Sequence, residues 1–294
     1  MQLDRLTPTF AALNRTTANA ILRNENATLA KLRAATAKAT NTMARAITVA
    51  NVFSGDTSQL VILGSARSTS FDLRSDISGI ILAQRQRARE LAHTRLDAEF
   101  DAIGVTAQAP IVGARADAER ASAAADTFTR AWVASVTQSP PGGKATASTV
   151  KAASGSQDYR LRRIAATENA QAYSAEHAAA ATWVAQTYRG AFAGAYRRWE
   201  AILDKAVCNI CRSMDGQLAP LDGPFMNGWE PGNVHPFCRC FDTLVLAPRK
   251  RDTGAGLVTK RKAMTTTLRP TAPPDNSPWG GGGQWGGGGS SGSF

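Results

Sequence analysis

The sequence predicts a mainly helical protein with long, alanine-rich N-terminal helices and a small α+β C-terminal domain stapled by zinc. Three observations lead to this fold class. Residues 1 to about 50 contain no glycine and a single proline, Pro8, so little interrupts a helix there. Only four aromatic residues, all phenylalanine, occur among residues 1–100, which favours slender helices over a thick globule. All four cysteines lie between residues 208 and 240, and they mark a metal-binding module.

The first part of the chain, residues 1–138, is predicted to be a helical region. Apolar residues recur every three to four positions from Leu6 to Leu32, which predicts one or two amphipathic helices over residues 1–50. Seven basic residues against two acidic ones give this segment a basic outer face, which is either solvated or turned toward DNA.

The second half of this region is predicted to alternate between connection and helix. Residues 54–75 are expected to form a connection with one short buried segment, Leu60-Val61-Ile62-Leu63. Helix formers dominate residues 76–103, and Gly104 is the expected C-cap. Residues 114–137 are predicted to form another alanine-rich helix.

A proline- and glycine-rich stretch places a linker at residues 139–156, before a C-terminal domain at residues 157–247. Within that domain, residues 157–194 are expected to be helical. Residues 195–202 are interpreted as a strand leading to the first cysteine, with helix as the alternative. Residues 241–246 are β-prone and could pair with that strand.

Composition and charge point to the kind of partner. The formal net charge of +11 favours a polyanion or an acidic protein surface. Residues 248–294 form a basic, proline- and glycine-rich tail that cannot bury enough surface to order itself. No signal peptide or membrane-spanning run is recognisable, so we expect the chain to stay in a reducing cytosol.

The most specific motif is Cys-x2-Cys followed, after residues 212–234, by His-x2-Cys-x-Cys. Zn²⁺ in structural sites takes four thiolate or imidazole ligands in a tetrahedron. Clustered cysteines in a reducing compartment indicate metal ligands before disulfides, and the alternative is a small reduced turn whose cysteines pack. The x2 spacing favours Cys238 over Cys240 as the fourth ligand, although either could bind. The five candidates for one structural zinc ion are Cys208, Cys211, His235, Cys238 and Cys240.

Two strings around the cysteines, WEAILDKAVCNICRSMDGQ and HPFCRCFDTLV, resemble the phage head morphogenesis family. These are the Mu F-like minor head proteins of tailed phages. The resemblance covers about residues 160–246. Upstream, Thr167, Glu168 and Asn169 match a family helix, but Ala166 stands where arginine is usual. The other matching positions are Trp199, Asp204, Cys208, Cys211, Asp215, Gly216, Gln217, His235, Pro236, Cys238, Arg239 and Cys240.

The resemblance implies a minor structural or assembly protein of a phage head. Such a protein acts at or near the portal in procapsid assembly and in DNA packaging or ejection. It is located in the head interior or at the portal vertex of the virion, after assembly in the host cytoplasm. The implied partners are the portal and other head proteins, and a basic chain suits non-specific contact with packaged DNA. No catalytic residue, small-molecule substrate or membrane is expected, and the zinc would be structural.

Two alternatives are a zinc-stabilised nuclease of the His-Asn-His type and a nucleic-acid-binding zinc module. A nuclease needs a general base beside a metal-bound phosphate. Among the three histidines, His93, His177 and His235, only His235 lies near the cysteines, where it is needed as a ligand. No recognition-helix pattern adjoins the cysteines. Glu168 is expected to pair with an arginine such as Arg163 or Arg197 rather than to act as a catalyst.

Overall fold

The computed structural model describes residues 7–102, 109–111, 114–137, 146–187, 192, 194–202 and 207–246, all of which belong to one unit, Met1–Ala247. Most of these residues are helical and the strands lie in the C-terminal part, which confirms the predicted fold class. Within the described part, no helix is both long and apolar enough to cross a membrane. The predicted cap Gly104 and the predicted tail, residues 248–294, lie outside the described residues.

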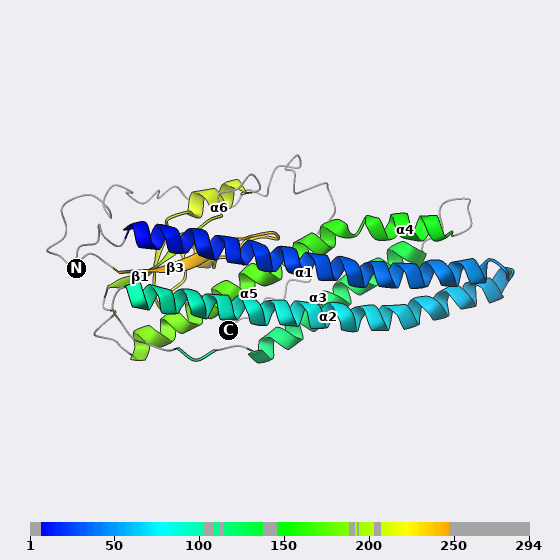
Figure 1. Ribbon diagram of the computed structural model, residues 1–294, viewed down its shortest axis with the longest axis horizontal. Helices are drawn as coiled ribbons and strands as arrows, with labels where there is room; N and C mark the ends of the chain where they lie inside the picture. Colours follow the sequence, from blue (N-terminus) through cyan, green and yellow to red (C-terminus); the bar gives the residue numbers. More distant parts are fainter. Residues whose placement is uncertain are drawn as a thin grey trace. The chain divides into compact units, whose positions relative to one another are not determined.

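Two long helices, α1 (Thr7–Ala50) and α2 (Gly55–Ala102), run side by side and are joined by a short turn (Figure 1). At 1.5 Å per residue they extend for about 66 and 72 Å. The residues that α1 buries are largely small, and alanine and threonine let the two helix axes approach closely. The sequence predicted one or two helices over residues 1–50, and the described part of this segment forms one, α1.

The predicted connection at residues 54–75 is wrong, because residues 55–75 form about the first six turns of α2. The segment Leu60–Leu63 is not buried either, since Leu60 is 68% and Leu63 is 59% exposed. Gly64 lies inside the helix with open space where a Cβ would be. A helical glycine costs only about 1 kcal/mol, and burial of nearby Ala66 and Leu73 outweighs that cost.

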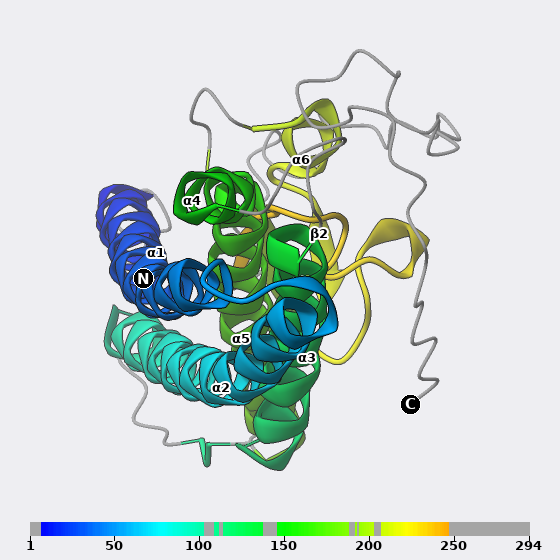
Figure 2. The same cartoon turned by 90° about the vertical axis from the view of Figure 1, so that its right-hand side faces the viewer.

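Three further helices pack against this pair: α3 (Ala114–Thr137), α4 (Ala147–Gly155) and α5 (Asp158–Thr187) (Figure 2). The segment predicted as a linker therefore contains a helix, α4. Thr146 caps it through a reciprocal capping box with Thr149. The buried Ser154 on α4 accepts a hydrogen bond from the Trp132 indole N–H and lies 2.5 Å from the Thr40 hydroxyl, so α4 joins α3 to α1.

The sheet has the order β2-β1-β3 and is antiparallel throughout, with strands Ala195–Glu200 (β1), Leu218–Pro220 (β2) and Phe241–Leu246 (β3). β1 is the strand predicted before the first cysteine, and its pairing with β3 is confirmed. β2 was not predicted. The short helix α6 (Asn209–Met214) and a 3₁₀ turn (Met226–Gly228) lie between the strands in sequence.

Buried charges attach the sheet to the helices. His177 of α5 is fully buried, and its two ring nitrogens each lie 3.1 Å from a carboxylate, one of Glu99 on α2 and one of Asp242 on β3. Arg197 of β1 donates to the same Asp242 oxygen at 2.7 Å. The other Glu99 oxygen accepts the backbone N–H of Leu244 at 3.0 Å, so a carboxylate of α2 occupies the outer edge of β3.

A second buried cluster holds α2, α3 and α5 together. Asp117 of α3 accepts hydrogen bonds from Arg85 at 2.7 Å and from Arg89 at 2.5 Å. Arg89 also donates to Glu176 of α5. Arg85 donates to Glu168 at 2.5 Å. The expected partners of Glu168, Arg163 or Arg197, are therefore corrected to Arg85, which is 83 residues away in sequence.

Candidate metal centre

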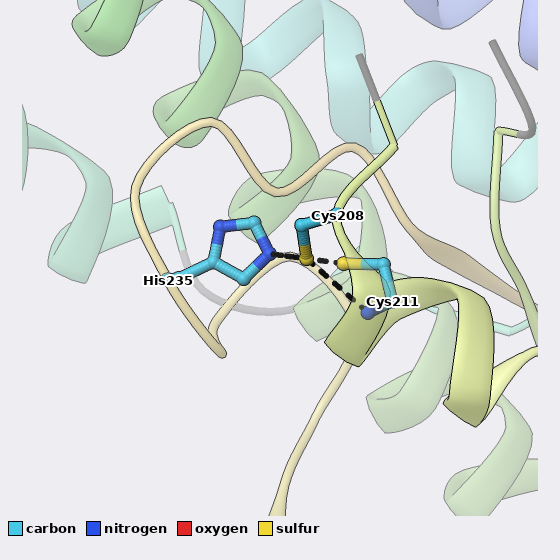
Figure 3. Close-up of side chains that lie close together, drawn as sticks. All are labelled: Cys208, Cys211 and His235. Atoms are coloured by element: carbon cyan, nitrogen blue, oxygen red, sulfur yellow. Dashed lines mark hydrogen bonds between the residues drawn. The ribbon is translucent and has the colours of Figure 1, made fainter. Parts of the chain in front are cut away.

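The Cys-x2-Cys pair lies at the start of α6. Cys208 is the N-cap of this helix, and its Sγ accepts the backbone N–H of Cys211 at 3.3 Å. An N-cap residue directs its side chain over the first turn, where unpaired N–H groups point. The two sulfurs consequently face the same side of the helix (Figure 3).

His235 approaches both sulfurs from the long loop. Its Nε2 lies 3.0 Å from the Sγ of Cys208 and 3.0 Å from the Sγ of Cys211 (Figure 3). Its Nδ1 lies 2.6 Å from the carbonyl oxygen of Pro236, and this oxygen can only accept. Nδ1 therefore carries a proton, and Nε2 is the ring nitrogen that faces the thiols and that would bind a metal after losing its own proton.

The remaining two cysteines complete a second group of three. The ligand atoms of Cys208, Cys211 and His235 lie within 4.8 Å of one another, and so do those of Cys211, Cys238 and Cys240. The Sγ atoms of Cys211 and Cys238 are 3.8 Å apart. All five predicted ligands thus come together in two overlapping groups that share Cys211, positioned to hold a metal ion.

The thiols are crowded enough to perturb one another. A hydrogen bond with Cys211, opposed by burial and aided by His235, lowers the pKa of Cys208 to about 4. The neighbouring Cys208, Cys238 and Cys240 raise the pKa of Cys211 well above its ordinary value. Burial would lower the pKa of His235, but Cys208 and Cys238 outweigh it and raise that pKa to about 9. The site therefore favours positive charge beside its sulfurs, which a divalent cation would supply.

A small core surrounds the cluster. Trp199 of β1 is fully buried and meets the Phe225 ring edge-on at 5.2 Å, and both pack in one cluster with Cys211, Cys238 and Cys240. The Asp-Gly-Gln turn is fixed to the same strand. Gly216 donates its backbone N–H to the Trp199 carbonyl, and Trp199 donates to the Gln217 carbonyl, both at 2.8 Å. Asp204 lies outside the described residues.

Helix α5 anchors the loop that carries His235. The hydroxyl of Thr167 accepts the backbone N–H of Phe237 at 3.1 Å, and Phe237 has a φ of 65°. The Gln171 side chain donates to Asn233 at 3.0 Å. The turn at Gly232, with a φ of 77°, lies directly against the α5 backbone.

These contacts explain the Thr-Glu-Asn string of α5. Thr167 holds the loop that carries His235, through the backbone N–H of Phe237. Glu168 binds Arg85 of α2, and Asn169 donates to the Ile21 carbonyl of α1 at 2.8 Å. Three consecutive side chains thus join α5 to three different elements. Sequence reasoning missed Gly232 and Gln171, and the only available signal was the turn-forming Pro231-Gly232-Asn233.

Comparison with known protein families gives a match that covers the cluster. The model of the family described as Phage Mu protein F like protein matches residues 136–242. This segment starts before the predicted domain boundary at residue 157 and contains α4, α5, β1, α6, β2 and the five candidate metal ligands. No curated protein and no solved structure matches the chain.

Proposed function

From the Mu F-like match, which supports a phage head morphogenesis protein, we propose that this chain is a minor structural or assembly protein of a tailed-phage head. It acts at or near the portal, in procapsid assembly and in DNA packaging or ejection. The observation that carries the proposal is that the Cys/His cluster and its anchors on α5 lie inside the matched segment. The proposed location is the virion, and the proposed partners are the portal and other head proteins.

We propose Zn²⁺ as the metal, held by Cys208, Cys211, His235 and Cys238. A tetrahedron with Zn–S bonds of about 2.3 Å has sulfur–sulfur edges of about 3.8 Å. The distance between the Cys211 and Cys238 sulfurs, 3.8 Å, fits this edge. The two S–Nε2 distances of 3.0 Å are shorter than the edge of about 3.5 Å that Zn–S and Zn–N bonds give. Binding would therefore move His235 outward by about half an ångström.

The proposed role of this zinc is structural. It joins α6 to the loop that ends at His235, and Thr167 and Gly232 connect that loop to α5. With four protein ligands no coordination position is left for water, which a catalytic site needs. Cys240, which the x2 spacing leaves as the spare cysteine, would pack in the small core beside Trp199.

The histidines argue against the nuclease alternative. His177 is fully enclosed between two carboxylates and cannot reach a substrate. His235 faces the thiols, and His93 is hydrogen-bonded to the buried Glu176 at 2.8 Å. The described part of the chain therefore offers no histidine beside the metal ligands that could serve as a general base.

The head role is tested in cells producing the phage that encodes the chain. Quantitative mass spectrometry of purified heads should find the protein in few copies per particle, and cross-links should join it to the portal. Replacement by Cys211→Ser should lower its incorporation, whereas Ser213→Ala on the exposed side of α6 should not. Full heads that lack the protein in the wild-type infection would overturn the proposal.

The metal proposal needs its own measurement on the purified, reduced protein. We expect about one equivalent of zinc per chain by elemental mass spectrometry. Less than about half an equivalent would refute it. DNA cleavage with Mg²⁺ or Mn²⁺ that His235→Ala abolishes would favour the nuclease instead.

A further inference from the structure

The outer face of α1 has an unusual composition. Between residues 11 and 48, every exposed residue of α1 is alanine, asparagine, threonine, lysine or arginine. Glu25, the one acidic residue of the helix, is only partly exposed, and one of its carboxylate oxygens is buried. Exposed large apolar side chains begin only at Val49, where the helix ends.

The basic residues of this face recur with the helical period. Arg23, Lys31, Lys38 and Arg45 are exposed and are each separated from the next by about two turns, so they follow one side of the helix. Together they extend over about 33 Å, close to the length of one turn of B-DNA, about 34 Å. The residues between them on this side are mostly alanine and threonine, which let a partner's backbone approach closely.

Most of these charges have no partner in the part of the chain that the structure describes. Among the described residues, no ion pair or side-chain hydrogen bond involves Arg23, Lys31 or Arg45. Lys38 lies 3.2 Å from Asp76 of α2, but the Lys38 side chain is 72% and the Asp76 side chain 42% exposed, so this surface pair is weak. By comparison, the buried arginines of α2 are all paired with carboxylates. The cationic charge of α1 is thus available to an outside partner.

We propose that this face of α1, with Arg23, Lys31, Lys38 and Arg45, is a sequence-independent binding surface for duplex DNA. Phosphates attract lysine and arginine regardless of sequence, and the exposed residues of α1 between positions 11 and 48 include no acid that would repel them. A protein partner fits less well, because protein interfaces depend on buried aromatic and large apolar anchors, and this face has none. The inference rests on the proposed place of the chain beside packaged DNA, but its test requires no phage heads.

The test uses the full chain and a mixed-sequence duplex of about 30 base pairs labelled with fluorescein. Fluorescence anisotropy gives the binding constant between 50 and 200 mM salt. The slope of log K against log salt is negative, and each lost phosphate contact reduces its magnitude by about 0.9. The triple variant Arg23→Gln, Lys31→Gln, Arg45→Gln should reduce this magnitude by about 2–3. Circular dichroism melting verifies that it remains folded.

A matched control removes the same charge elsewhere. Arg87→Gln, Arg120→Gln, Arg130→Gln replaces three exposed arginines on α2 and α3 and should change the slope by less than about 1. Equal effects of the two triple variants would overturn the proposal, because they would show that DNA binding depends on the net charge of the protein and not on the α1 face.

Two further outcomes would also overturn it. One is a salt slope that persists in the α1 variant but disappears when the seven basic residues of 248–294 are replaced by glutamine. The other is poly-glutamate binding as tight as DNA binding and equally dependent on α1, which would indicate an acidic protein partner. Either result, or no DNA binding at all, leaves the zinc content and head incorporation unaffected, so this failure is distinct from failure of the proposed function.

Discussion

Gly232 lies so close to α5 that a Cβ added to it would be 2.6 Å from the carbonyl carbon of Ala170. Its φ of 77° adds a second reason for glycine, since side chains disfavour this region. The loop that carries His235 is thus seated on the helix backbone itself. His235 comes three residues after Gly232, so the position of this proposed ligand depends on the contact.

Gly232→Ala should therefore destabilise the protein by about 2–4 kcal/mol, because the loop must move off the helix. Gly228→Ala is the matched control. Gly228 has a similar φ of 70° but open space around it, so only the backbone strain of about 1 kcal/mol is expected. Chemical denaturation of both variants measures the difference. Equal losses would mean that the close contact with Ala170 contributes nothing.

The two C-terminal cysteines should differ in their effect on metal binding. Cys238→Ser is expected to weaken zinc affinity more than about 100-fold, since loss of a ligand exceeds the 10–100-fold effect of losing its hydrogen-bonded neighbours. Cys240→Ser should keep about one zinc per chain. Competition with a chromogenic chelator measures both. The reverse pattern would place Cys240 in the tetrahedron and Cys238 in the small core.

Stability should depend on pH through His177. Burial would lower its pKa, but the carboxylates of Asp242 and Glu99 raise it from 6.5 to about 9. Because the pKa is higher in the folded protein, the stabilisation is complete below about pH 6.5 and is lost as the pH rises through about 9. The difference corresponds to about 3 kcal/mol of unfolding free energy.

Denaturation of the zinc-loaded protein at pH 6.5 and at pH 9.5 measures this loss, with His235 prevented from titrating by its metal. His177→Gln should be less stable at pH 6.5 and should remove most of the pH dependence. The carboxylates facing His177 are also bonded to arginines, Glu99 to Arg95 and Asp242 to Arg197. Burial would raise the pKa of Asp242, but Arg197 and His177 lower it to about 2, so Asp242 stays charged over this range. An unchanged pH profile in His177→Gln would assign the effect to other groups.

Asp117 should be among the least replaceable acids of the helical region. It is fully buried, and although burial raises its pKa, hydrogen bonds and charge from Arg89 and Arg85 outweigh this and lower it. Asp117→Asn leaves two buried guanidinium groups undercompensated and should cost about 3–5 kcal/mol. Asp126→Asn, which breaks a surface pair with Arg130, should cost less than about 1 kcal/mol. Thermal unfolding of the two variants gives the comparison, and similar losses would contradict it.

Local patterns in the sequence predicted much of this molecule. Helical periodicity and the lack of glycine predicted α1, and β-prone residues on both sides of the cysteines predicted the β1–β3 pair. Residues 54–75 were misassigned because Gly55, Gly64 and several serines suggested a loop, whereas packing of Ala66 and Leu73 against α1 makes the segment helical. The helix α4 was not predicted, and its residues were assigned to the linker at 139–156, because its threonine N-cap is a weak local signal.

The sequence by itself predicted which five Cys and His residues come together and their likeness to Mu F-like proteins, since spacing along the chain limits which side chains can meet around one point. Only the tertiary structure decided which charges pair inside the protein. Arg85 meets Glu168, and His177 lies between Glu99 and Asp242, across 65 to 83 residues of sequence. Such pairs depend on how whole helices and strands pack, because a buried charge must find its partner wherever the fold places one, and no local pattern records that position.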